Sequence, residues 1–401
     1  MSIDEMQSRE DREQKLRKAR RARTRSAVIK GSFAMLGGLV FLVIVMYGGM
    51  LLYEKLSERA EADTMADVRE GDFAFGESEN DGAGTEIPEN QDENAADAMS
   101  SVVVYSQEEL DARIAEAVTA AQQEEADRVL DEIKTSLSEG NTTIETLRPF
   151  YPNDIVVAGA GVIHFVPINW DLRTNQLDPA NLLVLESGEF QYLTDGQVTS
   201  HKGIDVSSHQ GDINWSLVAQ DGVEFAIIRV AYRGYGSTGR LVEDANFEKN
   251  IQGAQAAGIK VGVYIFSQAI TEEELLEEAN LVLTKIAPYQ LDCPVVYDVE
   301  MTADDGRMNN ISPEERTALT LLFCQTIENA GYKPMIYHNT QMGALMIDIA
   351  ALEAYDKWYA SYSEQMFYPY EYKIWQYSSK GQIQGIGTNV DLNICFEPIW
   401  E

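Results

Sequence analysis

The last two hundred or so residues contain eight strand-like runs, and their order limits the fold more than any other feature of the chain. The first five runs are each followed by a segment with helical character, whereas the last three lie too close together for helices between them. Alternating strands and helices imply a parallel sheet. The sequence therefore predicts an α/β, TIM-like barrel that closes with helix-free strands. The expected strands are 203–207, 224–230, 260–266, 294–300, 334–338, 357–361, 372–377 and 389–394.

Five helices are expected between these strands. Two have clear start signals, Thr271-x-x-Glu274 and Ser312-Pro313-x-Glu315, and two have glycine stop signals, Gly258 and Gly331. The expected helices are 215–220, 245–257, 272–287, 313–330 and 342–354.

Two acids end the fourth expected strand. The apolar run 293–297 leads into Asp298 and Glu300, which are two residues apart. In a strand such residues project to the same face. A buried carboxylate without a partner is costly, or its pKa rises, and a raised pKa is what a general acid needs. In barrels of this kind the chemistry lies at the C-terminal ends of the strands, where we expect this pair.

Two further acids are expected at the same mouth. Asp205 lies on the first strand and Asp391 on the eighth, and these strands are neighbours in a closed barrel. Mutual repulsion among four carboxylates raises some of their pKa values. Aromatic residues near the strand ends suit sugar rings, whose apolar faces stack on flat side chains, although for each aromatic taken singly the pattern favours packing in the core. These aromatic residues include Tyr264, Phe266, Tyr337, Trp358, Tyr359, Trp375 and Tyr377.

Several ordered motifs resemble the glycoside hydrolase family 25 lysozymes. They are Gly-Ile-Asp-Val-Ser-Ser-His-Gln-Gly-Asp-Ile-Asn-Trp at 203–215, Phe-Ala-Ile-Ile-Arg at 225–229, Val-Val-Tyr-Asp-Val-Glu at 295–300, Ile-Trp-Gln-Tyr-Ser at 374–378 and Asn-Val-Asp-Leu-Asn at 389–393. The resemblance covers about residues 201–401. It implies a (β/α)5(β)3 barrel that hydrolyses peptidoglycan, with retention, at the β-1,4 bond between N-acetylmuramic acid and N-acetylglucosamine.

The resemblance also implies roles for single residues. Glu300 matches the proton donor, and Asp205 and Asp391 match acids that flank the groove. Asp298 matches the second acid of the pair, which either attacks the sugar or orients its 2-acetamido group. Asn214 stands where many relatives have Asp, a peripheral departure. We expect the substrate to contact Tyr264, Tyr337, Trp375, Gln376, Tyr377, Arg229 and Tyr232.

Residues 33–53, which begin with Phe33 and end with Tyr53, contain no charged side chain. As a helix they are long enough to cross a bilayer. Lys and Arg cluster between positions 15 and 30, so the positive-inside rule predicts a cytosolic N-terminus and an extracytoplasmic remainder. A cleaved signal peptide is the alternative. It would need an unusually long n-region and h-region, with the small-residue site at 60–62 far downstream. We therefore predict a retained single-pass anchor in the cell membrane.

The remaining regions divide by composition. Residues 1–32 are a basic tail, and 54–105 are an acidic stretch too poor in large apolar residues to fold, hence a disordered linker. A long helix is expected over 106–139, either a dimerising coiled coil or a solvated spacer. Residues 141–200 read as a small β-rich module, a wall-glycan binder or a packing collar.

Composition also narrows the function. The net charge of −34 argues against nucleic-acid binding. Cys293, Cys324 and Cys395 are expected as small buried hydrophobes rather than as one bridge with a free thiol. The four histidines form no metal motif, so we expect no metal and no cofactor. The predicted function is a membrane-anchored muramidase. Alternatives are a weakly catalytic wall-binding or assembly module, or a hydrolase of another N-acetylglucosamine polymer.

Overall fold

The computed structural model describes residues 105–236, 238–302 and 306–400. The boundary between two units of the chain falls inside helix α2 (Gln107–Ser138), between Glu132 and Ile133. The predicted tail, the predicted anchor at 33–53 and nearly all of the predicted linker lie outside the described residues. Within the described ranges, no helix is both long enough and apolar enough to cross a membrane.

Helix α2 confirms the long helix predicted over 106–139. The Ser106 hydroxyl accepts a hydrogen bond from the Glu109 N–H (3.2 Å), and the Glu109 carboxylate accepts one from the Ser106 N–H (2.9 Å). This reciprocal pair is a capping box, which satisfies N–H groups at the helix start. None of the residues of α2 is buried, and Ile114 and Leu130 are 50% and 59% exposed. Most of the helix therefore receives little support from packing, although near its end the Ser136 hydroxyl lies 2.8 Å from the Thr146 hydroxyl.

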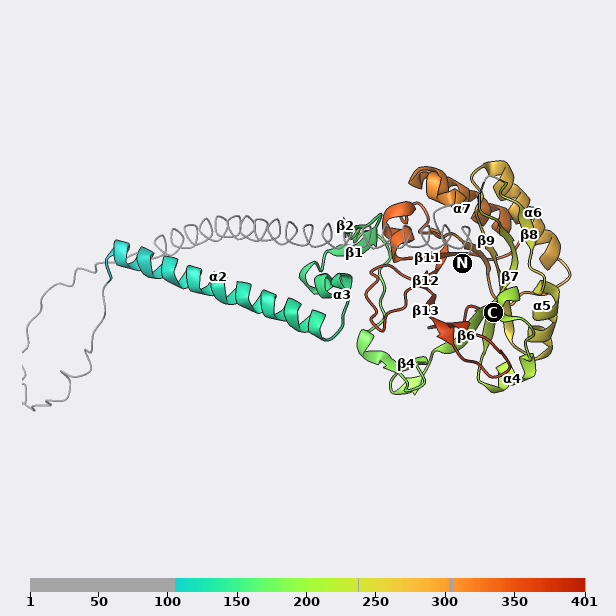
Figure 1. Cartoon of the computed structure of the whole chain (residues 1–401), viewed down its shortest axis with the longest axis horizontal. Helices are drawn as coiled ribbons and strands as arrows, with labels where there is room; N and C mark the ends of the chain where they lie inside the picture. Colours follow the sequence, from blue (N-terminus) through green and yellow to red (C-terminus); the bar gives the residue numbers. More distant parts are fainter. Residues whose placement is uncertain (1–104, 237, 303–305, 401) are drawn as a thin grey trace, which may run out of the picture. The chain divides into compact units, whose positions relative to one another are not determined.

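A closed barrel of eight strands forms the centre of the second unit (Figure 1). Each strand pairs with the next, and the last pairs with the first, as predicted. The final strand runs antiparallel to both of its neighbours, whereas the other pairings around the barrel are parallel. A short strand, β8 (Leu241–Glu243), extends β7 as a hairpin that was not predicted. The barrel strands are β6 (His201–Val206), β7 (Phe225–Arg233), β9 (Lys260–Phe266), β10 (Val295–Asp298), β11 (Pro334–Asn339), β12 (Asp356–Ala360), β13 (Ile374–Gly381) and β14 (Val390–Cys395).

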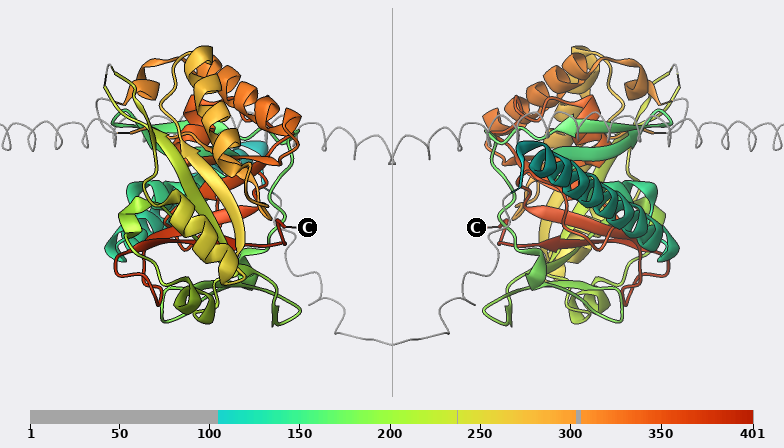
Figure 2. Two further views of the ribbon diagram at one scale, coloured as in Figure 1. Left: turned by 90° about the vertical axis from the view of Figure 1, so that its right-hand side faces the viewer. Right: turned by 90° about the vertical axis from the view of Figure 1, so that its left-hand side faces the viewer.

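Four of the five predicted helices are confirmed. Figure 2 shows the longer ones lying along the outside of the strands. The hydroxyls of Thr271 and Ser312 cap α6 and α7 as their motifs predicted. The Asn214 side chain caps α4 by accepting from the Leu217 N–H (3.3 Å), so the departure from the family motif retains a capping function. The helices are α4 (Trp215–Gln220), α5 (Phe247–Ala256), α6 (Glu272–Ile286) and α7 (Pro313–Asn329).

The prediction of a fifth helix over 342–354 is wrong. A single π-helical turn, η5 (Met342–Met346), is followed by turns that lead into β12. The Asp348 carboxylate accepts from the N–H groups of Ala350 and Ala351 (3.0 and 3.2 Å), and such local bonds compete with a continuing helix. The sequence periodicity therefore overstated the helix by two turns or more.

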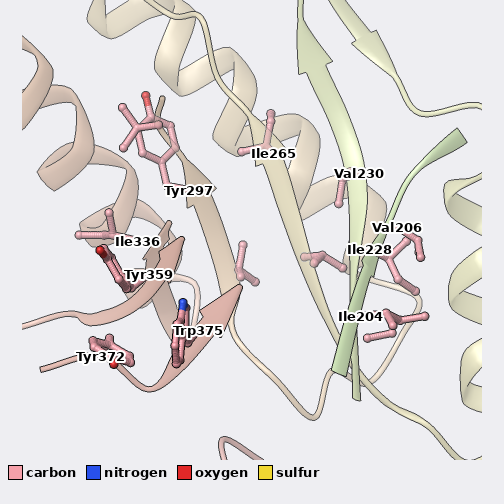
Figure 3. Close-up of a cluster of buried hydrophobic side chains, with 14 of the residues drawn as sticks. Ile204, Val206, Ile228, Val230, Ile265, Tyr297, Ile336, Tyr359, Tyr372 and Trp375 are labelled. Carbon is pink, nitrogen blue, oxygen red and sulfur yellow. The ribbon is translucent and has the colours of Figure 1, made fainter. Parts of the chain in front are cut away.

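The barrel strands separate two apolar clusters. The smaller cluster fills the inside of the barrel and includes Phe225, Val296 and Trp358. The larger one lies on the outer face (Figure 3), where Ile228, Val230, Ile265, Tyr297 and Trp375 are among its members. The alternation of side chains along each strand produces this division. All three cysteines are buried and form no disulfide. Cys293 and Cys395 lie in the inner cluster, and Cys324 lies in the outer cluster.

Residues 141–200 contain strands where the sequence predicts them, but these do not make one sheet. They form a two-stranded and a three-stranded sheet. Their buried side chains Ile155, Val157, Phe190 and Tyr192 belong to the outer-face cluster of the barrel. The segment therefore shares a core with the barrel instead of forming a module of its own. Its elements are α3 (Thr143–Leu147), η1 (Arg148–Phe150), β1 (Asp154–Gly159), β2 (Val162–Pro167), η2 (Pro179–Asn181), β3 (Leu182–Val184), β4 (Phe190–Thr194) and β5 (Gln197–Val198).

Candidate active site

Closure of the barrel brings Asp205 and Asp391 together. Asp205 on β6 is the direct cross-strand partner of Asp391 on β14. Directly opposed residues in an antiparallel pair have Cα atoms about 4.5–5.5 Å apart and side chains on the same face. Because β14 runs against the other strands, its beginning lies at the end where the parallel strands finish. Asp391, the second residue of β14, therefore reaches the same mouth as Asp205.

Asp298 and Glu300 lie at this mouth, but only Asp298 belongs to a strand. β10 ends at Asp298, which pairs with Phe266 of β9 and Tyr337 of β11. The prediction that both acids stand on one strand is thus corrected, since Glu300 follows in the connection to α7. Asp298 is 6% exposed, and its Oδ1 atom has no hydrogen-bond partner among the described residues. Glu300 is half-buried.

Gln376 connects the carboxylate of Asp205 with two tyrosine hydroxyls. Its Nε2 atom donates to Asp205 Oδ2 (2.8 Å), and its Oε1 atom accepts from the hydroxyls of Tyr337 (2.8 Å) and Tyr362 (3.1 Å). Gln376 and Tyr337 were predicted as site residues. Tyr362, which is 61% exposed just after β12, was not. Its position in a connection left no periodic signal that could have identified it.

Asn393 gives Asp205 a second hydrogen bond. Its Nδ2 atom donates to Asp205 Oδ2 (2.8 Å), and its Oδ1 atom accepts from Trp358 Nε1 (2.8 Å). These bonds fix the orientation of both the amide and the carboxylate. Asn393 was not predicted as a site residue, although it follows Asp391 by two positions and must share its face in a strand.

Burial raises the pKa values of all four acids. The pKa of Asp298 lies well above its ordinary value because of burial and then the charge of Glu300. That of Asp205 is also well raised, by burial and then the charge of Asp391, although Asn393 and Gln376 oppose the rise. The pKa of Glu300 rises to about 7, through burial and then Asp391, and that of Asp391 rises to about 6, through burial. The cluster therefore holds protons near neutral pH.

Arg229 is held beside the acids by a carboxylate that the sequence did not single out. Its guanidinium pairs with Asp244 (2.8 Å) and donates to the Ser208 hydroxyl (3.2 Å). It also lies 5.1 Å from the centre of the Tyr232 ring, another predicted contact. The charge of Arg229 lowers the pKa of Asp298, which partly offsets the effect of burial. Arg229 thus supplies positive charge at the predicted place.

Tyr264 and Tyr337, both predicted site residues, lie near the acids on the inner face. Each ring packs edge-to-face on Trp358, with centroid distances of 6.2 Å for Tyr264 and 4.7 Å for Tyr337. The pKa of the Tyr264 hydroxyl is well above its ordinary value, because of burial and then the charge of Asp205. Aromatic surface therefore adjoins the carboxylates, as expected for a sugar-binding site.

Trp375 and Tyr377 do not lie in the mouth. The Trp375 indole donates to the Ser361 carbonyl (2.9 Å), and its ring meets Phe190 edge-on at 5.2 Å. Tyr377 stacks on Phe190 at 4.1 Å. Both belong to the outer-face cluster. Their predicted placement at the substrate site is wrong because Gln376, between them on β13, points inward, and strand alternation turns its neighbours outward.

Comparisons with known proteins agree with this geometry. Residues 204–386 match the model of glycosyl hydrolases family 25. The autolytic lysozyme of Clostridium acetobutylicum is 26% identical over 199 residues, which are 49% of this chain and 56% of that protein. The uncharacterized protein YegX of Escherichia coli K12 is 28% identical over 207 residues, which cover 48% of this chain and 68% of that protein. This chain thus spans only about half the length of the autolytic lysozyme.

Among solved structures, a family 25 glycosyl hydrolase from Bacillus anthracis is similar, with 25% identity and a TM-score of 0.41 over 53% of this chain and 95% of that one. The matches in sequence are to glycoside hydrolases, one of them a lysozyme. More narrowly, the similarity to glycosyl hydrolases family 25 lies in residues 204–386.

Proposed function

We propose that the chain is a muramidase that hydrolyses the β-1,4 bond between N-acetylmuramic acid and N-acetylglucosamine in peptidoglycan. The observation that carries this proposal is the convergence of Asp205, Asp298, Glu300 and Asp391 at one barrel mouth beside aromatic side chains. A pair of carboxyl groups in different protonation states is the general requirement for cleaving glycosidic bonds. The matched family and the autolytic lysozyme add support.

Glu300 is the general acid and base in this proposal. With a pKa of about 7 its carboxyl group is partly protonated near neutral pH, and it donates that proton to the glycosidic oxygen as the bond to the leaving sugar breaks. The resulting Glu300 carboxylate then takes a proton from the water that attacks the anomeric carbon. The two displacements together retain the anomeric configuration.

Asp298 stabilises the first displacement in one of two ways. The charge of Arg229 favours the ionised form of Asp298, and in that form its carboxylate either attacks the anomeric carbon or orients the 2-acetamido group, whose carbonyl oxygen then attacks instead. The unpartnered Oδ1 atom of Asp298 leaves an acceptor free for either role. Trapping with a 2-fluoro sugar separates the two, because only direct attack yields a covalent bond to Asp298.

The decisive experiment measures new reducing ends on purified peptidoglycan. The full chain in detergent and a soluble form that begins at Ile133 should both release fragments with N-acetylmuramic acid at the reducing end. Glu300→Gln should lower the rate at least about a thousandfold without lowering the melting temperature, since it removes the proton donor and keeps the shape.

Asn393→Asp is a useful comparison because it perturbs Asp205 without removing a proton donor, and it should retain part of the activity. Fragments ending in N-acetylglucosamine would instead assign the chain to another bond specificity. Activity on chitin-like polymers but not on peptidoglycan would show that the substrate is such a polymer instead. Equal rates for the wild type and Glu300→Gln would remove Glu300 from the mechanism.

We further propose that residues 33–53 anchor the enzyme in the cell membrane, with the N-terminus in the cytosol and the barrel outside. The support is the uncharged run of twenty-one residues and the basic cluster that precedes it. Fractionation of cells that express the full chain, followed by protease treatment of spheroplasts, tests this. Digestion of the barrel from outside, with the basic tail protected, is the expected pattern.

We also propose that α2 pairs with α2 of a second copy. Its apolar residues Leu110, Ile114, Leu130 and Leu137 are 43–59% exposed, and apolar positions that the described residues leave exposed on one helix favour a coiled coil. Light scattering of the soluble form from residue 105 should give twice the chain mass. A form that begins at Asn141 should be monomeric, and a monomer from both forms would make α2 a spacer.

A further inference from the structure

The position of Glu300 depends on the chain around it, because no hydrogen bond from a described residue reaches its carboxylate. On the N-terminal side, Val299 is fully buried and its N–H points at the Tyr337 carbonyl at 3.5 Å. On the C-terminal side, the connection to α7 passes through the short 3-10 helix η4 (Arg307–Asn310). Contacts that hold the backbone just after Glu300 therefore also determine where the Glu300 carboxyl group lies.

Asn309 holds that backbone from the side. Its Oδ1 atom accepts from the Thr302 N–H (3.3 Å), and its Nδ2 atom donates to the Thr302 carbonyl (3.1 Å). One side-chain amide thus satisfies both backbone polar groups of a residue two positions after Glu300, as a neighbouring strand would. No strand neighbour is available there, because β10 has already ended at Asp298.

Gly306 allows this close approach. A Cβ atom at position 306 would lie 1.9 Å from the Thr302 hydroxyl and 3.0 Å from Asn309 Nδ2. The φ angle of Gly306 is −60°, so the need for glycine here is one of space rather than of backbone conformation. Thr302, Gly306 and Asn309 therefore form one tightly fitted unit, which we call the Asn309 clasp.

The clasp is in turn attached to the neighbouring strand end. The N–H of the buried Met308 donates to Gln268 Oε1 (3.2 Å), and the Arg307 guanidinium pairs with Glu274 (2.6 Å) and donates to the Gln268 carbonyl (3.3 Å). Gln268 lies just beyond β9 and is fully buried. The two residues that precede Asn309 are thus tied to the barrel mouth, and a rigid clasp can transmit that position to Thr302.

We propose that Asn309 is a positioning residue that sets where the Glu300 carboxyl group lies in the barrel mouth. The inference rests on the proposed function, in which Glu300 is the proton donor. Asn309 acts through the backbone of Thr302, which it holds on the side of Glu300 that β10 leaves unsupported.

The test compares two adjacent asparagines in the full chain. Asn309→Ala removes both bonds to Thr302, whereas the side chain of the exposed Asn310 reaches, among the described residues, the Gly306 carbonyl by a long contact (3.4 Å), so Asn310→Ala is the matched control. A displacement of about 1 Å at a catalytic group costs up to about a hundredfold in rate. We expect Asn309→Ala to lower kcat about 10- to 100-fold with KM within about twofold of the wild type, and Asn310→Ala to change neither.

A second readout separates positioning from loss of stability. In Asn309→Ala the Glu300 carboxyl gains water, so its pKa falls from about 7 toward its ordinary value and the basic limb of the kcat/KM profile moves to lower pH. Destabilisation alone would lower the melting temperature and leave this limb in place. Gly306→Ala, which crowds the same clasp through a different atom, should move the limb in the same direction.

Carboxyl NMR titration of Glu300, assigned by its loss in Glu300→Gln, makes the test independent of turnover. If the wild type cleaves no peptidoglycan, the proposed function fails, yet a lower Glu300 pKa in Asn309→Ala would still support the clasp. If the wild type cleaves peptidoglycan and Asn309→Ala has an unchanged kcat and titration, Asn309 is not a positioning residue.

Discussion

The two halves of the barrel wall are covered in different ways. Over β7 and β9 the outer face carries aliphatic residues such as Ile228, Val230 and Ile265, which pack beneath α5 and α6. In the described part of the chain no helix follows β12 or β13, and the outer face of this half carries large aromatic residues such as Tyr359 and Trp375. A regular helix suits small, regularly spaced side chains. An irregular cover needs large flat side chains to fill the space, because interiors must be packed densely.

The cover of the helix-free half comes from residues 141–200. Phe190 stacks on Tyr377 (4.1 Å) and meets Trp375 edge-on (5.2 Å), and Tyr192 meets Phe396 edge-on (5.3 Å). The sequence left two interpretations of this segment open, binding to wall glycan and packing on the barrel. These contacts support packing on the barrel. The segment substitutes for the helices that the last three strands lack.

The strongest way to break this comparison is to remove the cover. A soluble form that begins at His201 should fail to fold, or should expose hydrophobic surface, whereas a form that begins at Ile133 should unfold cooperatively. Each buried Phe, Val or Ile of the segment contributes about 1.5–3 kcal/mol, and several together approach the whole stability of a domain, about 5–15 kcal/mol. Circular dichroism and thermal unfolding measure the result. Melting temperatures within a few degrees of each other would make the segment dispensable.

A single substitution sharpens the comparison. Phe190→Ala should lower the free energy of unfolding by about 3–5 kcal/mol, because it leaves a cavity between Trp375 and Tyr377, and kcat of the folded enzyme should stay within about twofold. Phe165→Ala is the matched control. Phe165 is 41% exposed on β2 and packs on Tyr151, so the change should cost about 1 kcal/mol or less. A large loss of kcat in Phe190→Ala would instead connect the outer face with the chemistry.

A smaller effect is expected where the two halves meet. His338 on β11 is fully buried beside Tyr359 and Tyr368, and burial lowers its pKa to about 4. Between about pH 6.5 and 4 the unfolded chain binds a proton that the folded chain does not, so stability is lost as the pH falls through this range. The loss is about 3 kcal/mol or less.

Other buried groups change stability with pH in the opposite direction, since the raised pKa values of Glu278 and Glu300 favour the folded state at low pH. The measurement is therefore the difference between the wild type and His338→Phe, which keeps an aromatic ring but cannot be protonated. Denaturant unfolding at pH 7, 5.5 and 4 should show the wild type losing more stability than the variant. Parallel pH profiles would show that His338 does not titrate differently on folding.

Local signals in the sequence predicted most elements well. The strand at Lys260–Phe266 and the helix at Trp215–Gln220 have the predicted bounds, because short apolar runs and capping residues act over a few positions. The prediction of a helix over 342–354 fails because the Asp348 side chain accepts hydrogen bonds from the N–H groups of Ala350 and Ala351, contacts that apolar spacing does not reveal. The predicted end of the fourth strand at residue 300 is wrong for a non-local reason. The strand ends at Asp298 because its length depends on the neighbouring strands available for pairing.

In the candidate site, too, local signals were predictive, and features that depend on distant residues were missed. The four acids were predicted because their strands could be recognised one by one. Trp375 and Tyr377 were misplaced although they flank Gln376 on one strand, where alternation allows only one of the two sets to face the acids. Asp244, which holds Arg229, and Asn309, which holds Thr302, carry no signal of their own, because each becomes meaningful only through a partner that the fold brings near.

By itself the sequence determined the order of strands and helices and the placement of Asp205, Asp298, Glu300 and Asp391 near strand ends. Those features follow from propensity, capping and apolar spacing, which act between near neighbours in the chain. Only the tertiary structure decided that β14 runs antiparallel, so that Asp391 lies opposite Asp205, and that the segment before His201 covers the helix-free strands. These depend on pairing and packing between residues far apart in the chain, whose free energies no local pattern records.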